Sequence, residues 1–529
     1  MEFIDNAKWL AHAALDALIP RRTVLAELRG QWGRPGTKRE PFAGRWFELT
    51  RDAASCVDDK TWADLEFPRL FTDLDTTVTP LGSQALHRQL REYVDDPAEL
   101  AARHALHVRL RDDAPLRERL QQALMPLRAP EHAQVVEALF GEPPESPRGR
   151  WLPGLAGVCS LALLAAVIGW SWSVWWWLAV LPVNVAILYR HSWRVLREME
   201  QVAGCLRMLG VADRLAGVRA EAVPPLDRLR AEGWQRKLAS RALWPLRLCK
   251  QEGVNWVVMW LNLAFLFELN LHLWTVGRFF RLRDRLGESF AQVAALDAAI
   301  AMASALVLYP QHCRPELGVA PRLEIVEGRH PLLPDGVPNS IRLDGRSLLV
   351  TGSNMAGKTT FVKMLAINAI LGRSMGFCLA THAVLPTLPV MAAIHGEHAV
   401  AAGKSHYFAQ IEAIRGFLDG EARHGGGLFV LDEPFSGTNT VERIAIAAAV
   451  LRALGERSLV LVTTHDVELQ AMLGERYLLC HFQENPEVDG YFDYRLREGA
   501  ATARNAIRLL ARMGFPGDVV AAAMGHAQA

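Results

Sequence analysis

The sequence has almost no net charge and few cysteines, and both shortages restrict what the protein can be. Its 58 basic and 57 acidic residues leave a formal charge of +1, so overall electrostatics give no reason to expect a nucleic-acid partner. The seven cysteines are scattered through 529 residues, with no CxxC pair and no histidines at metal-ligand spacing. This pattern is typical of reduced thiols in a cytosolic protein.

No N-terminal targeting signal is visible either. The segment from Met1 to Gly30 begins with acidic Glu2 and Asp5 and carries charges throughout. A signal peptide would instead start with basic residues and continue with an apolar stretch. We therefore expect the bulk of the chain to stay in the cytoplasm.

The first part of the chain has the periodicity of packed helices. Apolar residues recur every three or four positions, as in Leu100 to Leu110 and Leu116 to Leu127, which is the pattern of one helix face. The proline-rich linker from Gly141 to Pro147 cannot continue a helix. We predict an N-terminal helical region over residues 1–150.

Charged residues are missing from the run Leu152 to Tyr189. One membrane crossing needs about 20 residues, so this run is long enough for two short spans that turn at Gly169 to Ser173. Basic residues on both sides of the run place its two ends in the cytoplasm by the positive-inside rule. These residues are Arg148 and Arg150 before it, and Arg190, Arg194 and Arg197 after it.

Tryptophans gather around the expected turn, at positions 170, 172, 175, 176 and 177. Such a cluster is typical of an aromatic belt at the far membrane interface. We predict a transmembrane helical hairpin over 151–190. The alternative is a hydrophobic helical hairpin buried in a soluble core.

The next region, 191–320, reads as further helices. Its apolar stretch from Val254 to Phe267 is short and is followed by Glu268 and His272, which favours a long buried helix over a third span. Prolines at 310, 315 and 321 then mark a boundary, after which strand-like and helical runs alternate. This alternation predicts an α/β domain over 321–529.

A glycine-rich sequence with Walker A spacing lies near the start of that domain. The apolar run Leu348 to Val350 precedes it and a helical pattern, Thr360 to Leu371, follows it, which is the context of a phosphate-binding loop. Lys358 is expected to reach the β- and γ-phosphates of ATP, and the Thr359 hydroxyl to bind Mg²⁺. A chance glycine-rich turn is the alternative. The expected nucleotide-binding residues are Gly352, Ser353, Asn354, Met355, Ala356, Gly357, Lys358, Thr359 and Thr360.

Two acidic residues follow the next buried-strand run, Leu428 to Leu431. Asp432 and Glu433 match a Walker B arrangement, in which the first carboxylate holds the Mg²⁺ shell and the second orients or deprotonates the attacking water. A solvated turn is the alternative for this pair. A third run, Leu459 to Thr463, ends in Thr464 and His465 at the same expected sheet edge. His465 is predicted to sense the γ-phosphate, and a structural histidine is its alternative.

With these residues in place, the sequence resembles the MutS family of ATPases. The matches keep their order over the last two hundred or so residues, and a weaker similarity to the start of the family's helical core runs from Asp58 to Gly82. The matching segments are Gly328 to Pro331, Val337 to Asn339, Thr351 to Thr360, Asp432 to Glu433, Gly437 to Thr440, Thr464 to His465, and Phe492 to Leu496 with Gly499.

The resemblance implies a homodimer with composite ATP sites. In this family a serine of one subunit reaches the nucleotide of the other, and Ser405 in the segment Gly403 to Phe408 matches it. Gln410 stands where the family usually has a glutamate. Tyr494 takes the place of a histidine that stacks on adenine and offers its ring instead. A core tyrosine is the alternative reading of that residue.

The sequence departs from the mismatch-recognising members of the family. Those members insert a phenylalanine from a Phe-x-Glu motif into DNA, whereas here only Phe140 to Glu142 and Phe482 to Glu484 have that pattern, in unsuitable contexts. The hydrophobic run lies where the family's DNA clamp is expected. DNA therefore remains possible without support from charge or from a recognition domain, although the basic run Arg228 to Arg247 leaves this open.

The expected fold is an α-helical core or lever region with a transmembrane hairpin, followed by an α/β P-loop domain of the kind found in ABC and MutS ATPases. The expected activity is ATP hydrolysis with Mg²⁺ in a membrane-anchored dimer acting on an unknown protein partner. We expect it at the inner or cytoplasmic membrane, with the ATPase domain in the cytoplasm. One alternative is a membrane-tethered, DNA-binding repair-like protein. Another is an ABC-type transporter ATPase, although residues Glu412 to Gly427 contain no LSGGQ-like signature.

Overall fold

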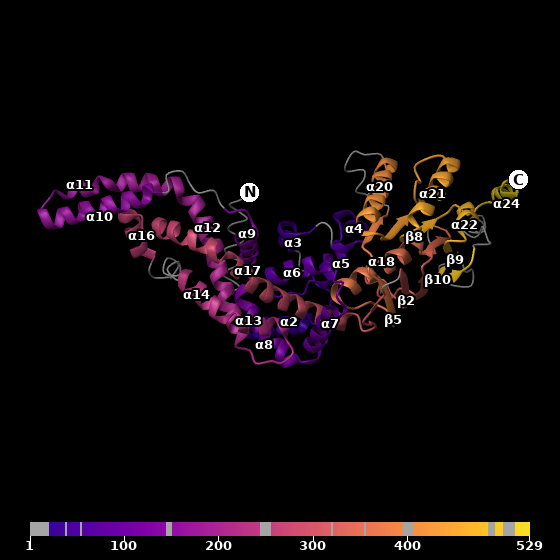
Figure 1. Cartoon of the computed structure of the whole chain (residues 1–529), viewed down its shortest axis with the longest axis horizontal. Coiled ribbons are helices and arrows are strands. Elements are labelled where there is room, and N and C mark those ends of the chain that lie inside the picture. The colour runs from indigo at the N-terminus through magenta and orange to yellow at the C-terminus, as the bar shows by residue number, and fades with distance from the viewer. Residues whose placement is uncertain are drawn as a thin grey trace. The chain divides into compact units, whose positions relative to one another are not determined.

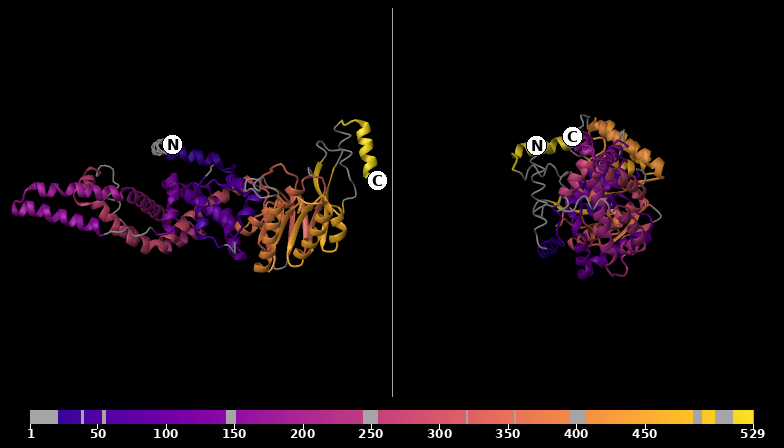
Figure 2. Two further views of the ribbon diagram at one scale, coloured as in Figure 1. Left: turned by 90° about the horizontal axis from the view of Figure 1, so that it is seen from above. Right: turned by 90° about the vertical axis from the view of Figure 1, so that its left-hand side faces the viewer.

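The computed structural model divides the chain into two compact units. It describes residues 21–37, 40–52, 56–143, 151–243, 255–318, 321–353, 356–394, 406–484, 492–500 and 514–528. One unit comprises residues 1–51, 74–88 and 106–307, and the other comprises 52–73, 89–105 and 308–529. Both are drawn in Figure 1 and, from two further sides, in Figure 2.

The C-terminal unit contains two sheets, as the alternating pattern after residue 321 predicts. The larger sheet has six strands in the order β10-β9-β4-β8-β7-β6, and only β10 is antiparallel to its neighbour. The smaller has four strands in the order β1-β5-β2-β3. The strands are β1 (Glu316–Gly318), β2 (Arg322–Gly328), β3 (Asn339–Asp344), β4 (Ser347–Thr351), β5 (His382–Pro386), β6 (Val390–Ala393), β7 (Leu428–Asp432), β8 (Leu459–Thr464), β9 (Tyr477–Glu484) and β10 (Phe492–Glu498).

Helices cover both faces of the larger sheet. The helix α18 (Lys358–Met375) contacts β7 and β8 of this sheet and β2 and β5 of the smaller one, so it lies between them and most of its side chains are buried. The helices α20 (His406–His424) and α21 (Thr440–Leu454) supply Phe417 and Leu451 to a core with Phe429 on the opposite face. Two shorter helices complete the unit, α22 (Glu468–Leu473) and α24 (Gly517–Gln528).

Two N-terminal segments belong to this sheet-containing unit, which corrects the expected contiguous region over 1–150. In α4 (Asp59–Asp64), the Thr61 hydroxyl accepts a hydrogen bond from Ala392 N at 2.9 Å, and Asp64 accepts one from Ile394 N at 2.9 Å. The Tyr93 hydroxyl accepts a third from Val390 N at 3.0 Å. An edge strand exposes unpaired N–H groups, so these side chains close the free edge of β6.

The other unit is helical. Its core includes Trp46, which meets Phe290 edge-to-face with ring centroids 4.9 Å apart. Besides α4, given above, and α10, α11, α12 and α16, described below, the helices that precede the first strand are α2 (Arg21–Gln31), α3 (Arg45–Thr50), α5 (Phe67–Leu74), α6 (Pro80–Arg91), α7 (Pro97–Asp112), α8 (Ala114–Leu124), the 3-10 turns η1 (Met125–Leu127) and η2 (Pro130–Gln134), α9 (Val135–Phe140), α13 (Pro224–Ala231), α14 (Gly233–Leu243) and α17 (Phe267–Leu308). Of these, most of α5 and the first part of α7 belong to the sheet-containing unit.

A buried carboxylate joins α17 to the start of α6 within this unit. Asp297 is fully buried and accepts hydrogen bonds from Val78 N at 3.0 Å, Thr79 N at 2.8 Å and the Thr79 hydroxyl at 2.7 Å. A Cβ atom at Gly82 would lie 2.2 Å from an oxygen of Asp297. Glycine at this position therefore allows the close approach of the two helices.

The uncharged run forms two helices joined by a short connection, with a break close to the expected turn. The helix α10 (Leu152–Trp170) ends at Ser171, whose φ is +53°, and α11 (Val174–Leu178) leads into α12 (Val180–Ala216). The helix α12 continues past residue 190, so the predicted hairpin and the helical region predicted to follow it share one helix. No proline or glycine interrupts the sequence between Pro182 and Gly204.

Two helices are long and apolar enough to cross a membrane by length and composition. For Leu152–Trp170 only 22% of the most apolar window is buried, whereas for Arg278–Leu308 the figure is 72%. The second is the core helix of the helical unit, and a buried core helix passes the same test. The transmembrane hairpin thus stays a prediction, carried by α10 and the shorter apolar segment Val174–Arg190.

The expectation of a long buried helix over Val254 to Phe267 is wrong. The helix α16 (Asn255–Phe265) has 11 residues and ends at Leu266, whose φ is +53°. The indole of Trp260 on this helix is 62% exposed. The uninterrupted apolar sequence conceals this break, because leucine is a good helix former and gives no stop signal.

Replacing Asp297 with alanine is expected to destabilise the helical unit. Three buried donors would lose their acceptor, which costs at least about 2 kcal/mol. Asp227→Ala is the matched control, because that carboxylate is exposed and paired with Arg230 at the surface, where such a pair contributes at most about 1 kcal/mol. The urea midpoint can be followed by labelling of Cys205, which is fully buried in the same unit. Equal urea midpoints for the two variants would contradict the stabilising role assigned to Asp297.

Candidate functional site

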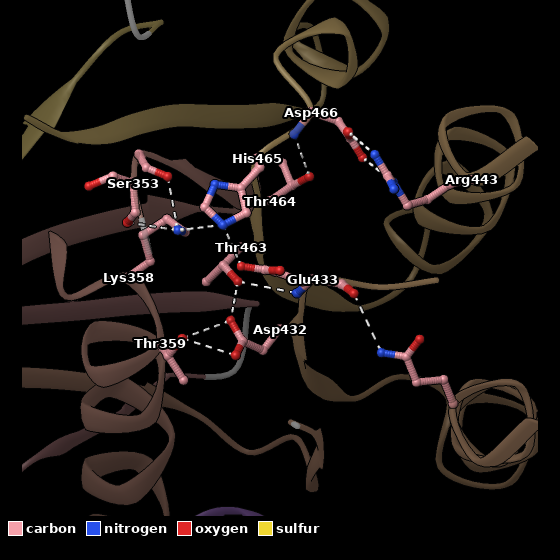
Figure 3. A network of polar contacts seen from close by, with 12 residues as sticks. Ser353, Lys358, Thr359, Asp432, Glu433, Arg443, Thr463, Thr464, His465 and Asp466 are labelled. Atoms are coloured by element: carbon pink, nitrogen blue, oxygen red, sulfur yellow. Dashed lines mark hydrogen bonds and ion pairs between the residues drawn. The ribbon is translucent and has the colours of Figure 1, made fainter. Parts of the chain in front are cut away.

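The site lies where three neighbouring parallel strands end. The strands β4, β8 and β7 are adjacent in the larger sheet, and each is followed by predicted site residues. Carboxyl ends of parallel strands meet at one edge of a sheet, where ligands bind in α/β folds. Figure 3 shows that Lys358, Asp432, Glu433 and His465 converge at this edge.

The loop between β4 and α18 requires glycine at two positions. Gly352 has φ +141°, and a Cβ atom there would lie 2.7 Å from the carbonyl oxygen of Phe482. Gly357 has φ +95° and immediately precedes the first turn of α18. The loop therefore leads into a helix N-terminus, whose free N–H groups favour an anion. Asn354 and Met355 lie outside the described residues.

Lys358 is the first residue of α18 and is almost fully buried. Its ammonium donates hydrogen bonds to the carbonyl oxygens of Gly352 at 2.9 Å and Ser353 at 3.0 Å. Burial lowers the pKa of Lys358, while the carboxylates of Glu433 and Asp432 oppose this shift. A buried cation at the mouth of a loop is placed to meet a negatively charged ligand.

Thr359 and Asp432 face each other across the end of the sheet. The Thr359 hydroxyl lies 2.9 Å from both carboxylate oxygens of Asp432, and the Thr463 hydroxyl also donates to that carboxylate. Hydroxyl and carboxylate oxygens suit Mg²⁺, which commonly takes one or two carboxylates and completes its shell with water and phosphate. The pair fits the expected metal role. Among the described residues no cluster of three acidic, histidine or cysteine side chains could form a separate metal site.

Glu433 and His465 form a close pair. The carboxylate of Glu433 lies 2.6 Å from Nε2 of His465, and both side chains are partly exposed, at 30% and 38%. The same ring nitrogen lies 3.3 Å from the ammonium of Lys358. Because one nitrogen cannot donate to the carboxylate and accept from the ammonium at once, the shorter contact with Glu433 is the stronger hydrogen bond. His465 thus lies between the carboxylate of Glu433 and the ammonium of Lys358.

The backbone at Glu433 adopts an uncommon conformation. Its φ is +47° and that of Phe435 is +64°, in the left-handed region that side chains other than glycine rarely adopt. The N–H of Glu433 donates to Thr463 O at 3.1 Å. Such a conformation persists only where neighbouring contacts hold it.

Gln410 supplies two of these contacts, a role that the sequence did not reveal. On α20, its side-chain oxygen accepts from Phe435 N at 2.9 Å, and its side-chain nitrogen approaches Glu433 O at 3.4 Å. The sequence marked Gln410 only as a departure from the family pattern. A hydrogen bond between residues 25 positions apart leaves no local signal.

A second unanticipated contact fixes the segment after His465. Arg443 on α21 forms a bidentate ion pair with Asp466, at 2.8 Å and 2.6 Å. Bidentate arginine pairs hold geometry better than single contacts. The pair therefore restrains the backbone next to His465 (Figure 3).

A cavity of about 560 Å³ adjoins the loop. Tyr494 lines it with φ +52°, and its ring is 46% exposed, so the core-tyrosine alternative is wrong. Asn339 holds this strand by donating to Tyr494 O at 2.9 Å and accepting from Leu496 N at 2.8 Å. His330 also lines the cavity, and burial lowers its pKa to about 4, which keeps the ring neutral at pH 7. The ring of Tyr494 thus forms part of the cavity wall, and the ring of His330 in that wall is uncharged.

The remaining residues singled out in the sequence are Ser405 and the phenylalanines of the two Phe-x-Glu patterns. Ser405 lies outside the described residues, and α20 begins directly after it at His406. The two Phe-x-Glu phenylalanines are not free to insert into DNA. Phe482 is buried in β9, and Phe140 packs against Trp46 and Phe290 with ring centroids 5.8 and 5.6 Å apart.

Comparison with known proteins identifies relatives of the whole arrangement. The family described as MutS domain V matches residues 348–529. The chain is 34% identical over 255 residues to the DNA mismatch repair protein MutS of Thermus aquaticus, covering 47% of this chain and 31% of the relative. It is 27% identical over 574 residues to the DNA mismatch repair protein MutS of Anaeromyxobacter dehalogenans, covering 90% of this chain and 62% of the relative.

The chain thus spans less than two thirds of the length of the curated relatives that it matches. None of these matches supports the alternative of an ABC-type transporter subunit. The longer alignment extends far beyond the sheet-containing unit into the helical region. Residues 348–529 therefore match domain V of the MutS family, and the similarity to MutS proteins extends over most of the chain.

Proposed function

We propose that this chain is a MutS-type ATPase that hydrolyses ATP with Mg²⁺ and works as a homodimer anchored in the membrane. The observation that carries the proposal is the convergence of Lys358, Thr359, Asp432, Glu433 and His465 at one end of three adjacent strands. MutS-family proteins are ATPases, and each of these side chains has an expected role in phosphoryl transfer.

The phosphates of ATP are proposed to lie in the loop 352–359. Backbone N–H groups of the loop and of the first turn of α18 would bind the phosphate oxygens. Lys358 would exchange its bonds with the loop carbonyls for bonds to phosphate. Thr359 and Asp432 would hold Mg²⁺, which neutralises charge on the phosphates when it is bound.

Glu433 is proposed to accept a proton from the attacking water. Its distance from His465 allows the imidazole to hold the carboxylate in position and to contact the γ-phosphate from the other side. Tyr494 is proposed to stack on the adenine ring in the adjoining cavity. The sequence places Ser405 as the residue that reaches the nucleotide of the second subunit.

Membrane anchoring is proposed through residues 152–189, with the ATPase unit in the cytoplasm. On α10 the side chains of Leu155, Val158 and Ile168 are 51%, 63% and 77% exposed. A soluble surface rarely carries so continuous an apolar patch. Contact with lipid would remove these side chains from water.

The DNA-binding alternative draws on the names of the relatives, which are DNA mismatch repair proteins. Two arginines of the basic run Arg228 to Arg247 already form ion pairs with carboxylates of the same chain. Arg236 is buried and paired with Asp213 at 2.9 Å, and Arg230 is paired with Asp227 at 2.6 Å. Phosphate binding depends on free Lys and Arg side chains, so these two ion pairs argue against phosphate binding by Arg230 and Arg236.

Replacing Glu433 with glutamine is expected to abolish hydrolysis while nucleotide binding persists. Loss of a general base typically lowers the rate about 10²- to 10⁴-fold. Glu456→Gln is the matched control, because Glu456 is exposed on the surface and paired with Arg476. Steady-state phosphate release and equilibrium binding of a fluorescent ATP analogue separate the two effects. Wild-type turnover in Glu433→Gln would overturn the assignment.

The Gln410 contacts predict different outcomes for two substitutions. Gln410→Leu leaves Phe435 N–H without its acceptor and should lower kcat about tenfold at an unchanged KM, since about 1.4 kcal/mol corresponds to a factor of ten. Gln410→Glu keeps an acceptor oxygen and should retain most activity. Equal losses in both variants, or a change confined to KM, would show that Gln410 does not position Glu433.

Binding to DNA at two salt concentrations distinguishes the two functional candidates. We expect the detergent-solubilised full chain to bind matched, mismatched and branched DNA weakly, and to lose this binding as salt rises, because only sequence-independent phosphate contacts remain. Glu433→Gln in the presence of ATP serves as the nucleotide-locked form. Tight, nucleotide-dependent binding that survives high salt would instead favour the tethered repair protein.

A further inference from the structure

The break between α16 and α17 leaves three carbonyl groups without partners inside the helix. Leu266 has φ +53° and is fully buried, and its N–H closes the last turn of α16 by donating to Asn262 O at 2.9 Å. The carbonyls of Leu263, Ala264 and Phe265 come after that turn. Carbonyls at a helix C-terminus need partners from elsewhere.

Side chains of three helices supply those partners. The side-chain nitrogen of Asn184 on α12 donates to Leu263 O at 3.0 Å and Ala264 O at 2.9 Å. The Ser160 hydroxyl on α10 donates to Ala264 O at 2.5 Å. Asn270 on α17 donates to Pro153 O at 3.0 Å and to Phe265 O at 3.4 Å. Every carbonyl of the break is therefore bonded within the protein.

Two of these donors are shielded from solvent, and the helix end is packed tightly. Ser160 and Asn184 are both fully buried. A Cβ atom at Gly157 on α10 would lie 2.7 Å from Phe265 O, so the backbones approach closely at that glycine. Small residues and side-chain hydrogen bonds of this kind are typical of helix contacts within membranes.

The surface around this buried polar centre is apolar. The exposed side chains on α10 include Leu161 and Ile168, those on α12 include Val183 and Val185, and Trp260 projects from α16. In water, solvent would satisfy a helix end without any dedicated donor. In hydrocarbon every backbone polar group must be bonded inside the protein. The combination of satisfied carbonyls and an apolar exterior meets the requirements of a hydrocarbon environment.

We propose that α16 is a half-helix inserted in the lipid bilayer beside α10 and α12, a third membrane-embedded element of this chain. The proposal rests on the membrane anchoring proposed above and extends it to a segment whose length alone argues against spanning. Its 11 residues cover about 16 Å at about 1.5 Å per residue, roughly half of a hydrocarbon core of about 30 Å. The occupant of the apolar surface is lipid.

The start of α17 indicates where the chain leaves the bilayer. Arg278 lies over the ring of Trp274, with Cζ 3.4 Å from the ring centroid, and tryptophan and arginine are typical of a membrane interface. Eight residues separate Trp274 from the break, a rise of about 12 Å. The break would then lie near the middle of the bilayer, where the carboxylate of Glu268 accepts a hydrogen bond from the side-chain nitrogen of Asn262 at 3.1 Å.

Spin labels at three single cysteines test this placement in proteoliposomes of the full chain. The native cysteines are replaced, and the labels are attached at Trp260→Cys on α16, Ile168→Cys on α10 and Trp234→Cys on α14. Trp234 is the matched control, since both tryptophans are 62% exposed. We expect oxygen, which dissolves in lipid, to reach positions 260 and 168 severalfold better than a water-soluble nickel complex does. Position 234 should show the reverse.

The possible results separate this inference from the membrane anchor. If position 168 contacts lipid and position 260 is open to nickel, the half-helix is wrong while the anchor stands. Shielding of position 260 from both reagents would mean that protein covers α16, which also overturns the inference. If neither 168 nor 260 contacts lipid, both proposals fail. Retained ATP hydrolysis shows that the labelled proteins are folded.

A glycine pair provides a second measurement. Gly157→Val inserts a side chain against Phe265 O and should push α16 out of the bilayer, so the nickel accessibility of a label at position 260 should rise severalfold. Gly169→Val is the matched control on the same helix, because a Cβ atom there meets nothing within 4 Å. Unchanged accessibility in Gly157→Val would contradict the close packing of α16 on α10.

Discussion

The carboxylate of Asp432 is the contact on which the candidate site depends. It accepts hydrogen bonds from Thr359 at the start of α18 and from Thr463 at the end of β8, while its own residue ends β7. One side chain thus links the helix that follows the glycine-rich loop to two central strands. Because Glu433 comes next in the chain and bonds to Thr463 O, its position follows from the same arrangement. Thr359 and Asp432 are the residues that would hold Mg²⁺, whose positive charge would act on the phosphates.

The backbone near Glu433 explains why the surrounding contacts matter. Two residues with positive φ, Glu433 and Phe435, cost free energy of order 1–3 kcal/mol each. The hydrogen bonds that Phe435 N and Glu433 N donate to the side chains of Gln410 and Thr463 offset that cost. Since α20 begins one residue after Ser405, the helix that holds Glu433 also follows the element expected to reach the second subunit.

The parts of the site that sequence reasoning found are those with local signals. The apolar runs before Gly352, Asp432 and Thr464 are buried strands, and their parallel order brings the following polar residues together. Contacts between distant residues gave no such signal. The packing of Thr61 against the edge of β6 joins residues 331 positions apart, and the Arg443 pair with Asp466 joins the helix α21 to the segment that follows β8. Sequence reasoning therefore missed that each of the two units is built from separate stretches of the chain, and it missed the role of Gln410.

In the apolar helices, too, sequence reasoning found the local signals and missed contacts between distant residues. Composition alone predicted two helices over the uncharged run, because the absence of charge and the central serines are visible in the sequence. It could not predict the break at Leu266, since neither glycine nor proline marks it. That break is stable only because Ser160, Asn184 and Asn270 come from other helices to bond its carbonyls. Polar residues in an otherwise apolar sequence are thus better read as partners of distant backbone groups than as interruptions of the helices that carry them.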